Sequence, residues 1–173
     1  MNHILEFDFR YSSTWDVIRG LDQAFANRDR RADGMEQLET AETIIGIGYI
    51  ALQTYITGAI ADLGAVFQIS QKPHELRAMA PTLGRTGATV IEAVWSLANY
   101  FKHHEEWPDW NAEGSRRSTI ETLTRLHIAE DTEFPCIELM KIVEPDHWRL
   151  LPLLESGSRW REGLFTSLRA ENE

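Results

Sequence analysis

Apolar and charged side chains alternate near the N-terminus of the chain. Leu5, Phe7, Phe9 and Tyr11 are each separated from the next by one charged residue, which gives a period of two. This period is typical of a β-strand with one buried face. No second run of comparable quality follows in the chain. We therefore expect an extended or strand-like arm over residues 1–12, which pairs with a short irregular segment or another copy, or lies over helices.

The pattern changes to helical spacing after this segment. Ser12, Ser13 or Thr14 can cap a helix whose apolar stripe begins at Trp15, and the Asp-Gly pair at 33–34 marks its end. A longer helix is expected from about residue 35 into the sixties. It begins with acidic side chains, which the positive end of a helix dipole favours, and then becomes apolar on nearly every face. Such a helix belongs in the middle of a bundle.

The second half of the chain continues as helices and polar connections. Prolines and glycines between residues 70 and 87 predict a connector with one short helical turn. Further helical stretches are expected at 88–107, 120–127, 136–143 and 148–168. The sequence thus predicts an all-α fold, an up-and-down helical bundle of about five helices. We expect a single helical domain over residues 1–173, with the bundle at 13–173 behind the N-terminal arm.

Charge and cysteine content narrow the classes of protein. The 173 residues carry a net charge of -10, whereas general binding to DNA needs a basic surface that releases counterions from phosphates. The single cysteine, Cys136, excludes an internal disulfide and a multi-cysteine zinc site, and it fits a reducing cytoplasm. Its apolar neighbours in the sequence predict a buried, unreactive thiol. We expect a cytoplasmic location, since the first residues include acidic side chains where a signal peptide has positive ones.

One segment is long enough to span a membrane. Residues 44–67 are mostly apolar, but they include Gln53, Thr54, Thr57 and Asp62, which are costly in hydrocarbon. We therefore interpret the segment as a buried central helix and expect no membrane partner.

The stretch "ANYFKHHEEW" at residues 98–107 concentrates polar and aromatic side chains. On a helix, residues three and four apart share one face. Trp95, Asn99, His103 and Glu106 then form one stripe. An adjoining stripe contains Tyr100, His104 and Trp107.

Four interpretations of this stretch remain open. His103 and Glu106 have the spacing of metal ligands inside helical bundles, but a Glu-x-x-His partner on another helix is missing. The two histidines can instead be cations at a helix C-terminus. His103 can act in acid–base catalysis, with Asn99 orienting its ring or the substrate. Finally, the corner from Trp107 to Trp110 can anchor a partner.

An asparagine followed after three residues by a histidine, on an internal helix of an all-α protein, resembles the motif of the HEPN superfamily. This resemblance implies a helical bundle that often dimerises, and in many members a metal-independent ribonuclease of toxin–antitoxin or antiviral systems. The family motif is an arginine, a polar residue, a short spacer and a histidine. Asn99 matches the polar position and His103 the histidine, while Ala98 occupies the arginine position. This departure removes the guanidinium that would stabilise a phosphate in the transition state.

Two main functional hypotheses follow from this comparison. The first is a HEPN-like homodimer of a bacterial defence or toxin–antitoxin system, which binds RNA or is a degenerate ribonuclease that needs no metal or other cofactor. His103 would then be the acid–base group, Asn99 would position it, and Lys102 would contact phosphate.

The second is a non-enzymatic acidic interaction protein of the immunity or antitoxin type, which covers a basic partner. A metal-binding bundle using His103 and Glu106 is a third. The expected binding residues are Trp95, Tyr100, His104, Glu106, Trp107 and Trp110.

Overall fold

The computed structural model describes residues 7–27, 33–107, 109–111 and 113–172. These residues form seven α-helices with no strand, so the all-α prediction is confirmed, although about five helices were expected. The helices are α1 (Phe9–Ala26), α2 (Gly34–Gly64), α3 (Pro73–Ala78), α4 (Val90–His103), α5 (Arg117–Arg125), α6 (Pro135–Val143) and α7 (Leu151–Asn172).

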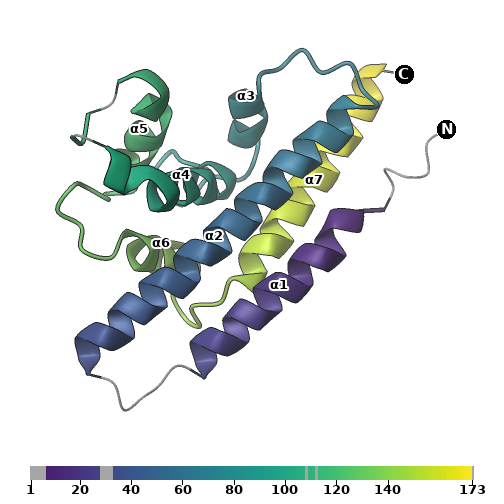
Figure 1. The fold of residues 1–173 in the computed structure, drawn as a ribbon. Coiled ribbons are helices and arrows are strands. Elements are labelled where there is room, and N and C mark those ends of the chain that lie inside the picture. Colours follow the sequence, from purple (N-terminus) through teal and green to yellow (C-terminus); the bar gives the residue numbers. More distant parts are fainter. Residues whose placement is uncertain (1–6, 28–32, 108, 112, 173) are drawn as a thin grey trace.

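The helices form two groups, and α2 belongs to the first group and contacts the second. The long helices α1, α2 and α7 lie side by side, while α3, α4, α5 and α6 gather on the other side of α2 (Figure 1). Helix α4 crosses α2 at an angle instead of running along it (Figure 1). The up-and-down description therefore fits the three long helices better than the second group.

The N-terminal arm was predicted wrongly where the structure describes it. Helix α1 already begins at Phe9, so Phe9 and Tyr11 are helical, and residues 1–6 lie outside the described residues. Asp8 provides the reason for this start. Its Oδ1 accepts a hydrogen bond from the backbone nitrogen of Tyr11 at 3.1 Å, as an N-cap residue does. Its other oxygen accepts the hydroxyl of Tyr55 from α2, which fastens the start of α1 to the core.

Helix α2 is the centre of the molecule, as its apolar sequence predicts. Asp33 caps its first turn by accepting a hydrogen bond from the Glu36 backbone nitrogen at 2.9 Å. Among the described residues, α2 is the one helix whose length and composition would let it cross a membrane, and 56% of its apolar 18-residue window is buried inside the protein. Such burial is typical of a core helix.

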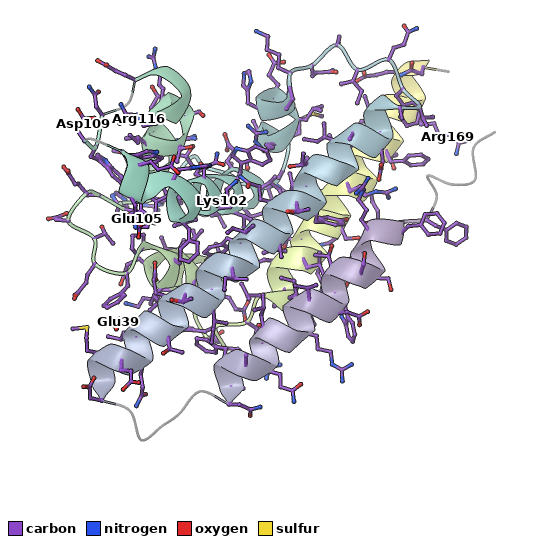
Figure 2. All side chains as sticks on the ribbon, in the orientation of Figure 1. Glu39, Lys102, Glu105, Asp109, Arg116 and Arg169 are labelled. Atoms are coloured by element: carbon purple, nitrogen blue, oxygen red, sulfur yellow. The ribbon has the colours of Figure 1, made fainter. Side chains whose placement is uncertain are left out.

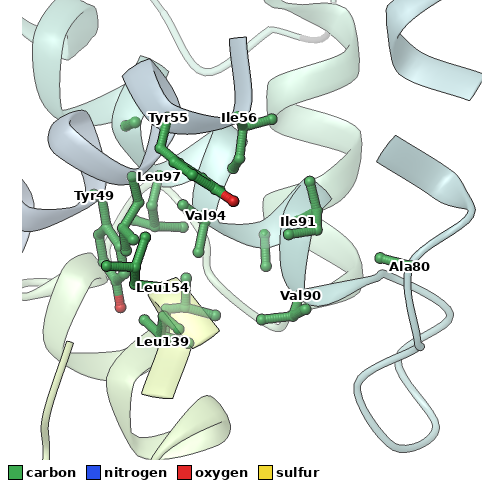
Figure 3. Close-up of a cluster of buried hydrophobic side chains, with 14 of the residues drawn as sticks. Tyr49, Tyr55, Ile56, Ala80, Val90, Ile91, Val94, Leu97, Leu139 and Leu154 are labelled. Carbon is green, nitrogen blue, oxygen red and sulfur yellow. The ribbon is translucent and has the colours of Figure 1, made fainter. Parts of the chain in front are cut away.

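The core lies between α2 and its neighbours on both sides. Figure 3 shows Tyr49 and Tyr55 of α2 together with Val94 and Leu97 of α4 and Leu154 of α7. The Tyr49 hydroxyl is fully buried, and it donates to the backbone oxygen of Cys136 at 3.2 Å. This satisfies a polar group that would otherwise be costly inside an apolar cluster.

Two helices are capped by carboxylates from other parts of the chain. The Glu42 carboxylate accepts hydrogen bonds from the backbone nitrogens of Cys136 and Ile137 at the start of α6, at 2.8 and 2.9 Å. Asp22 does the same at the start of α7, where it accepts from the backbone of Leu150 and Leu151 at 2.8 and 3.2 Å. A carboxylate at a helix N-terminus satisfies free N–H groups and interacts favourably with the helix dipole.

Candidate functional site

Most of the candidate residues lie on helix α4, and the structures at its two ends determine their positions. Thr89 and Glu92 form a capping box at its start: the Thr89 hydroxyl oxygen accepts from the Glu92 backbone at 3.1 Å, and the Glu92 carboxylate accepts from the Thr89 backbone at 2.8 Å. At its other end α4 tightens into a 3₁₀ turn, His104–Glu106. The change of twist moves the last polar side chains out of the helical register.

Asn99 is held by two other helices. Its Oδ1 accepts a hydrogen bond from Nε2 of Gln53 on α2 at 2.8 Å. Its Nδ2 donates to Oγ1 of the buried Thr119 on α5 at 3.4 Å, near the limit of hydrogen-bond length. Gln53 also donates to the backbone oxygen of Trp95 at 3.2 Å. The Asn99 side chain therefore joins α2, α4 and α5.

His103 lies beyond this network, at the exposed end of α4. Its Nδ1 is 3.4 Å from Oε2 of Glu106, and about half of its side chain is exposed to solvent. The stripe predicted from the sequence thus brings His103 and Glu106 together. It does not make Asn99 an orienting partner of the His103 ring, because the Asn99 amide bonds to Gln53 and Thr119 instead.

Ala98 is fully buried in the core. The arginine position of the HEPN motif therefore corresponds here to a core position, and a guanidinium on this side of α4 would lie among apolar side chains. Lys102 does not replace it in this arrangement. Its Nζ donates to Oε1 of Gln53 at 2.6 Å, so the ammonium group lies against the polar network of α2 (Figure 2).

Four aromatic rings cluster at the C-terminal end of α4, and we call Tyr100, His104, Trp107 and Trp110 the aromatic corner. Tyr100 is at its centre, stacked on His104 at 4.8 Å between ring centroids. Trp107 and Trp110 each meet Tyr100 edge-on at 5.7 Å and each other at 6.2 Å. These T-shaped contacts are a favoured geometry for aromatic rings. The sequence predicted a stripe of Tyr100, His104 and Trp107, and the structure adds Trp110 to these three rings.

The centre of the aromatic corner is chemically neutral. Burial raises the pKa of the Tyr100 phenol, and the nearby Cys136 and Glu42 raise it further. The hydroxyl is therefore protonated at neutral pH. Trp107 and Trp110 are half-buried, so parts of both rings face solvent. The corner is a preformed apolar surface with polar edges.

Charged side chains surround the aromatic corner. Figure 2 shows Glu105, Asp109 and Arg116 at this end of the molecule, and all three lie on or near its surface. Arg116 donates to both the backbone oxygen and Oδ1 of Asp109, each at 3.1 Å, which fixes the loop that carries Trp110. Glu105 and Glu106 are exposed as well, so carboxylates form most of the border.

Trp95 is separate from the aromatic corner. Its ring packs against the guanidinium of Arg77 on α3, with 4.0 Å between Cζ and the ring centroid, which is a cation–π contact. Burial lowers the pKa of Arg77, while Glu92 opposes the shift. Trp95 therefore anchors α3 on α4, and its role in binding stays a prediction.

Sequence analysis missed the partners that fix α4. Gln53 and Thr119 belong to helices 46 and 20 residues from Asn99, and no local spacing connects them. A signal did exist for Gln53, because a polar amide within an otherwise apolar helix needs a buried partner. No such signal marks Thr119.

The described residues give little support to a metal centre. His103 and Glu106 lie together, but no group of three histidine, cysteine, aspartate or glutamate side chains that could hold a metal ion is found in the part of the chain that the structure describes. The partly buried carboxylate of Glu42 on α2 accepts hydrogen bonds from the start of α6 instead of meeting these two side chains.

Comparison with known proteins adds no further constraint on this site. No protein-family model matches the chain, and neither a curated protein nor a solved structure matches it significantly.

Proposed function

We propose that this chain is a non-enzymatic binding protein that uses the aromatic corner and its acidic border to cover a basic surface of another protein. The observation that carries this proposal is a set of four rings in mutual contact, with Trp107 and Trp110 half-buried and exposed carboxylates of Glu105 and Glu106 beside them. Tryptophan and tyrosine are common anchors of protein interfaces, where they bury a large apolar area and keep a polar edge. A border of one sign selects partners of the opposite sign and speeds their encounter.

The arrangement around Asn99 supports binding over catalysis. A general acid or base needs an oriented ring close to the reacting group. Here the Asn99 amide joins Gln53 and Thr119, while His103 points to the carboxylate of Glu106. The core position of Ala98 leaves no guanidinium at the motif's phosphate-binding place.

The proposal is tested with two kinds of variant at the aromatic corner. Tagged protein captures partners from cells that express it, and each captured protein is purified and its affinity measured again. Glu105→Lys combined with Glu106→Lys reverses charge at exposed positions without touching the core. Trp107→Ala removes an anchor ring. Each should weaken the binding of a basic partner about tenfold or more, because anchor residues contribute roughly 2 kcal/mol or more.

Glu162→Lys on α7 is the matched control. Glu162 is exposed and far along the chain from the corner, so a charge reversal there should leave the affinity unchanged. The corner substitutions Glu105→Lys and Glu106→Lys are also measured singly, so that each matches this control in net charge. If the corner variants and Glu162→Lys weaken binding equally, only net charge matters and the proposed surface is wrong. If the partners are acidic or bind elsewhere, the proposal is also wrong.

The HEPN-like ribonuclease remains a prediction that the same protein can test. Purified wild type and His103→Ala are incubated with total RNA in the presence of a chelator. We expect intact RNA in both. Cleavage by the wild type that disappears in His103→Ala would establish an enzyme and overturn the non-enzymatic assignment.

A further inference from the structure

A second candidate site lies at the opposite end of α4 from the aromatic corner. A pocket of about 640 Å³ opens between α7, the end of α6 and the segment that follows α3. This volume is within the range of roughly 300–1,000 Å³ that small-molecule sites occupy. Its walls are mainly apolar and include Leu83, Val90, Leu153, Trp160 and Leu164. Ala80 and Val90 of this wall lie at the margin of the core cluster in Figure 3.

The tryptophan in the wall contributes only its apolar surface. The Trp160 side chain is buried, and its Nε1 donates to the backbone oxygen of Leu76 at 2.9 Å. The polar edge of the indole is thus satisfied by α3. What remains for the pocket is the ring itself, which suits an apolar group.

Gly163 marks open space along the α7 wall of the pocket. Helix α7 contains two glycines, and the first, Gly157, has a packing reason: an added Cβ would lie 3.2 Å from the Tyr55 ring. Gly163 lines the pocket, and an added Cβ there would meet nothing within 4 Å. A larger side chain at position 163 would extend into this open space, so the position can be used to block the pocket.

One end of the pocket carries a positive charge in a fixed position. Arg159 lines the pocket, and its Nη2 donates to Oγ of Ser156 at 3.0 Å. Ser156 in turn donates to the backbone oxygen of Pro152 at 2.9 Å, which fixes the hydroxyl. In the part of the chain that the structure describes, no carboxylate lies within 4.0 Å of the Arg159 guanidinium.

The pocket also contains one acidic side chain, Glu144. Its Oε1 is 3.8 Å from Nδ1 of His147, so it already has a neighbour that can become a cation. The charge that remains to be matched by a ligand is therefore the one on Arg159. Guanidinium groups form strong, directional hydrogen bonds with carboxylates.

We propose that this pocket binds a small organic carboxylate with an apolar body. The carboxylate pairs with Arg159, and the apolar body packs against Trp160 and Leu164 in the space beside Gly163. The proposal is independent of the protein-binding surface at the aromatic corner, because it uses different residues at the other end of α4.

The test measures binding of three probes by isothermal titration calorimetry: decanoate, decanol and decyltrimethylammonium, which share a chain length and differ in head-group charge. All are used below the concentrations at which they form micelles. Decanoate should bind more tightly than the other two. Arg159→Gln should weaken decanoate about tenfold or more and leave decanol unchanged, because a hydrogen bond to a charged group contributes roughly 1.5–3 kcal/mol.

Gly163→Leu tests the location of the site. The new side chain enters empty space, so the fold should be retained, and binding of every probe should be lost. Ser167→Leu, which also lines the pocket, is a second blocking variant if Gly163→Leu alters the circular dichroism spectrum. Gly20→Ala on α1 is the control, because it changes a helical glycine away from the pocket.

Three results would overturn the proposal. Decanoate binding that survives both blocking variants places the ligand elsewhere. If decanol binds as tightly as decanoate, the carboxylate does not pair with Arg159. Absence of decanoate binding, together with dimers in sedimentation that Gly163→Leu dissociates, would show that a second copy of the chain fills the pocket.

Discussion

The side-chain amide of Gln53 on α2 donates to the side-chain oxygen of Asn99 on α4, with 2.8 Å between Nε2 and Oδ1. Gln53 is buried, and it also contacts the Trp95 backbone and the Lys102 ammonium group. One glutamine thus holds three successive turns of α4. The same contact gives Asn99 a structural role and leaves His103 without an asparagine partner.

Replacement of Gln53 should therefore destabilise the whole fold. Gln53→Leu keeps a similar volume but removes the donor to the Asn99 side-chain oxygen and the acceptor of the Lys102 ammonium group. Unsatisfied buried polar groups cost roughly 1–3 kcal/mol, and we expect the free energy of unfolding to fall by about this amount. Urea denaturation followed by far-UV circular dichroism measures it.

Thr54→Ala is the matched control for this prediction. Thr54 is the next residue on α2, but it is exposed, and its hydroxyl donates only to the Ile50 backbone of its own helix at 2.9 Å. Its removal should change the free energy of unfolding by less than about 0.5 kcal/mol. Equal losses in the two variants would contradict a special role for Gln53.

Two glycines should respond to alanine in opposite directions. An added Cβ at Gly46 on α2 would overlap the ring of Phe101, whereas at Gly20 on α1 it would meet nothing within 4 Å. Gly46→Ala should lower the free energy of unfolding by about 1–3 kcal/mol through overpacking. Gly20→Ala should raise it by about 0.5–1 kcal/mol, because alanine favours a helix more than glycine does. Thermal and urea unfolding of both variants measure the sign of the change in the free energy of unfolding. A change of the same sign in both variants would contradict this packing between α2 and α4.

Much of the fold could be predicted from local sequence signals. The Asp-Gly pair at 33–34 predicted a helix boundary, and Asp33 does cap α2 there. The mostly apolar middle of α2 predicted its central place. The prediction of an extended N-terminal arm was wrong for a physical reason. Apolar and charged residues alternate over residues 5–11, as in a strand, but the same region also contains an apolar stripe with helical spacing. That stripe begins at Tyr11 and continues through Trp15 and Ile18, spaced four and three, and the cap at Asp8 decides in its favour.

The candidate site was only partly predictable for a different reason. His103 ends α4 and Glu106 lies in the 3₁₀ turn that follows directly, so their contact is local in sequence, and the structure places the two side chains 3.4 Å apart. The role of Asn99 depends on Gln53 and Thr119, which other helices bring to it. Tertiary contacts of this kind leave no trace in the periodicity of α4, so local spacing suggested an Asn99–His103 pair that the fold does not make.

The Glu42 carboxylate should make stability depend on pH. Burial raises its pKa above the usual value of 4.5, although its hydrogen bonds from Cys136 and Ile137 oppose the shift. A raised pKa means that the folded protein binds the proton more tightly than the unfolded chain. The contribution of this group is therefore fully present below about pH 4.5 and is lost as the pH rises through the folded-state pKa.

A comparison with Glu42→Gln isolates this effect from the other titrating groups. Glutamine does not titrate, so the difference in free energy of unfolding between wild type and Glu42→Gln should shift in favour of wild type as the pH falls from 7 toward 4.5. Urea denaturation of both proteins at several pH values gives this difference. A difference that is constant with pH would show that Glu42 has the same pKa in both states.

Cys136 should react with iodoacetamide only when the protein unfolds. The thiol is fully buried, and burial together with the nearby Glu42 carboxylate raises its pKa well above 9.0. The thiolate is the reactive form, so both access and ionisation suppress alkylation. Labelling of the native protein should be slower than labelling in urea by a factor of at least ~1,000, since opening a stable core costs about 5 kcal/mol or more. Mass spectrometry over time measures the rate unambiguously, because the chain has a single cysteine.

Glu42→Ala removes the cap of α6 at Cys136 and should accelerate labelling, whereas Glu162→Lys should not. Rapid labelling of the native wild type would mean that α6 opens far more easily than its packing against α2 implies.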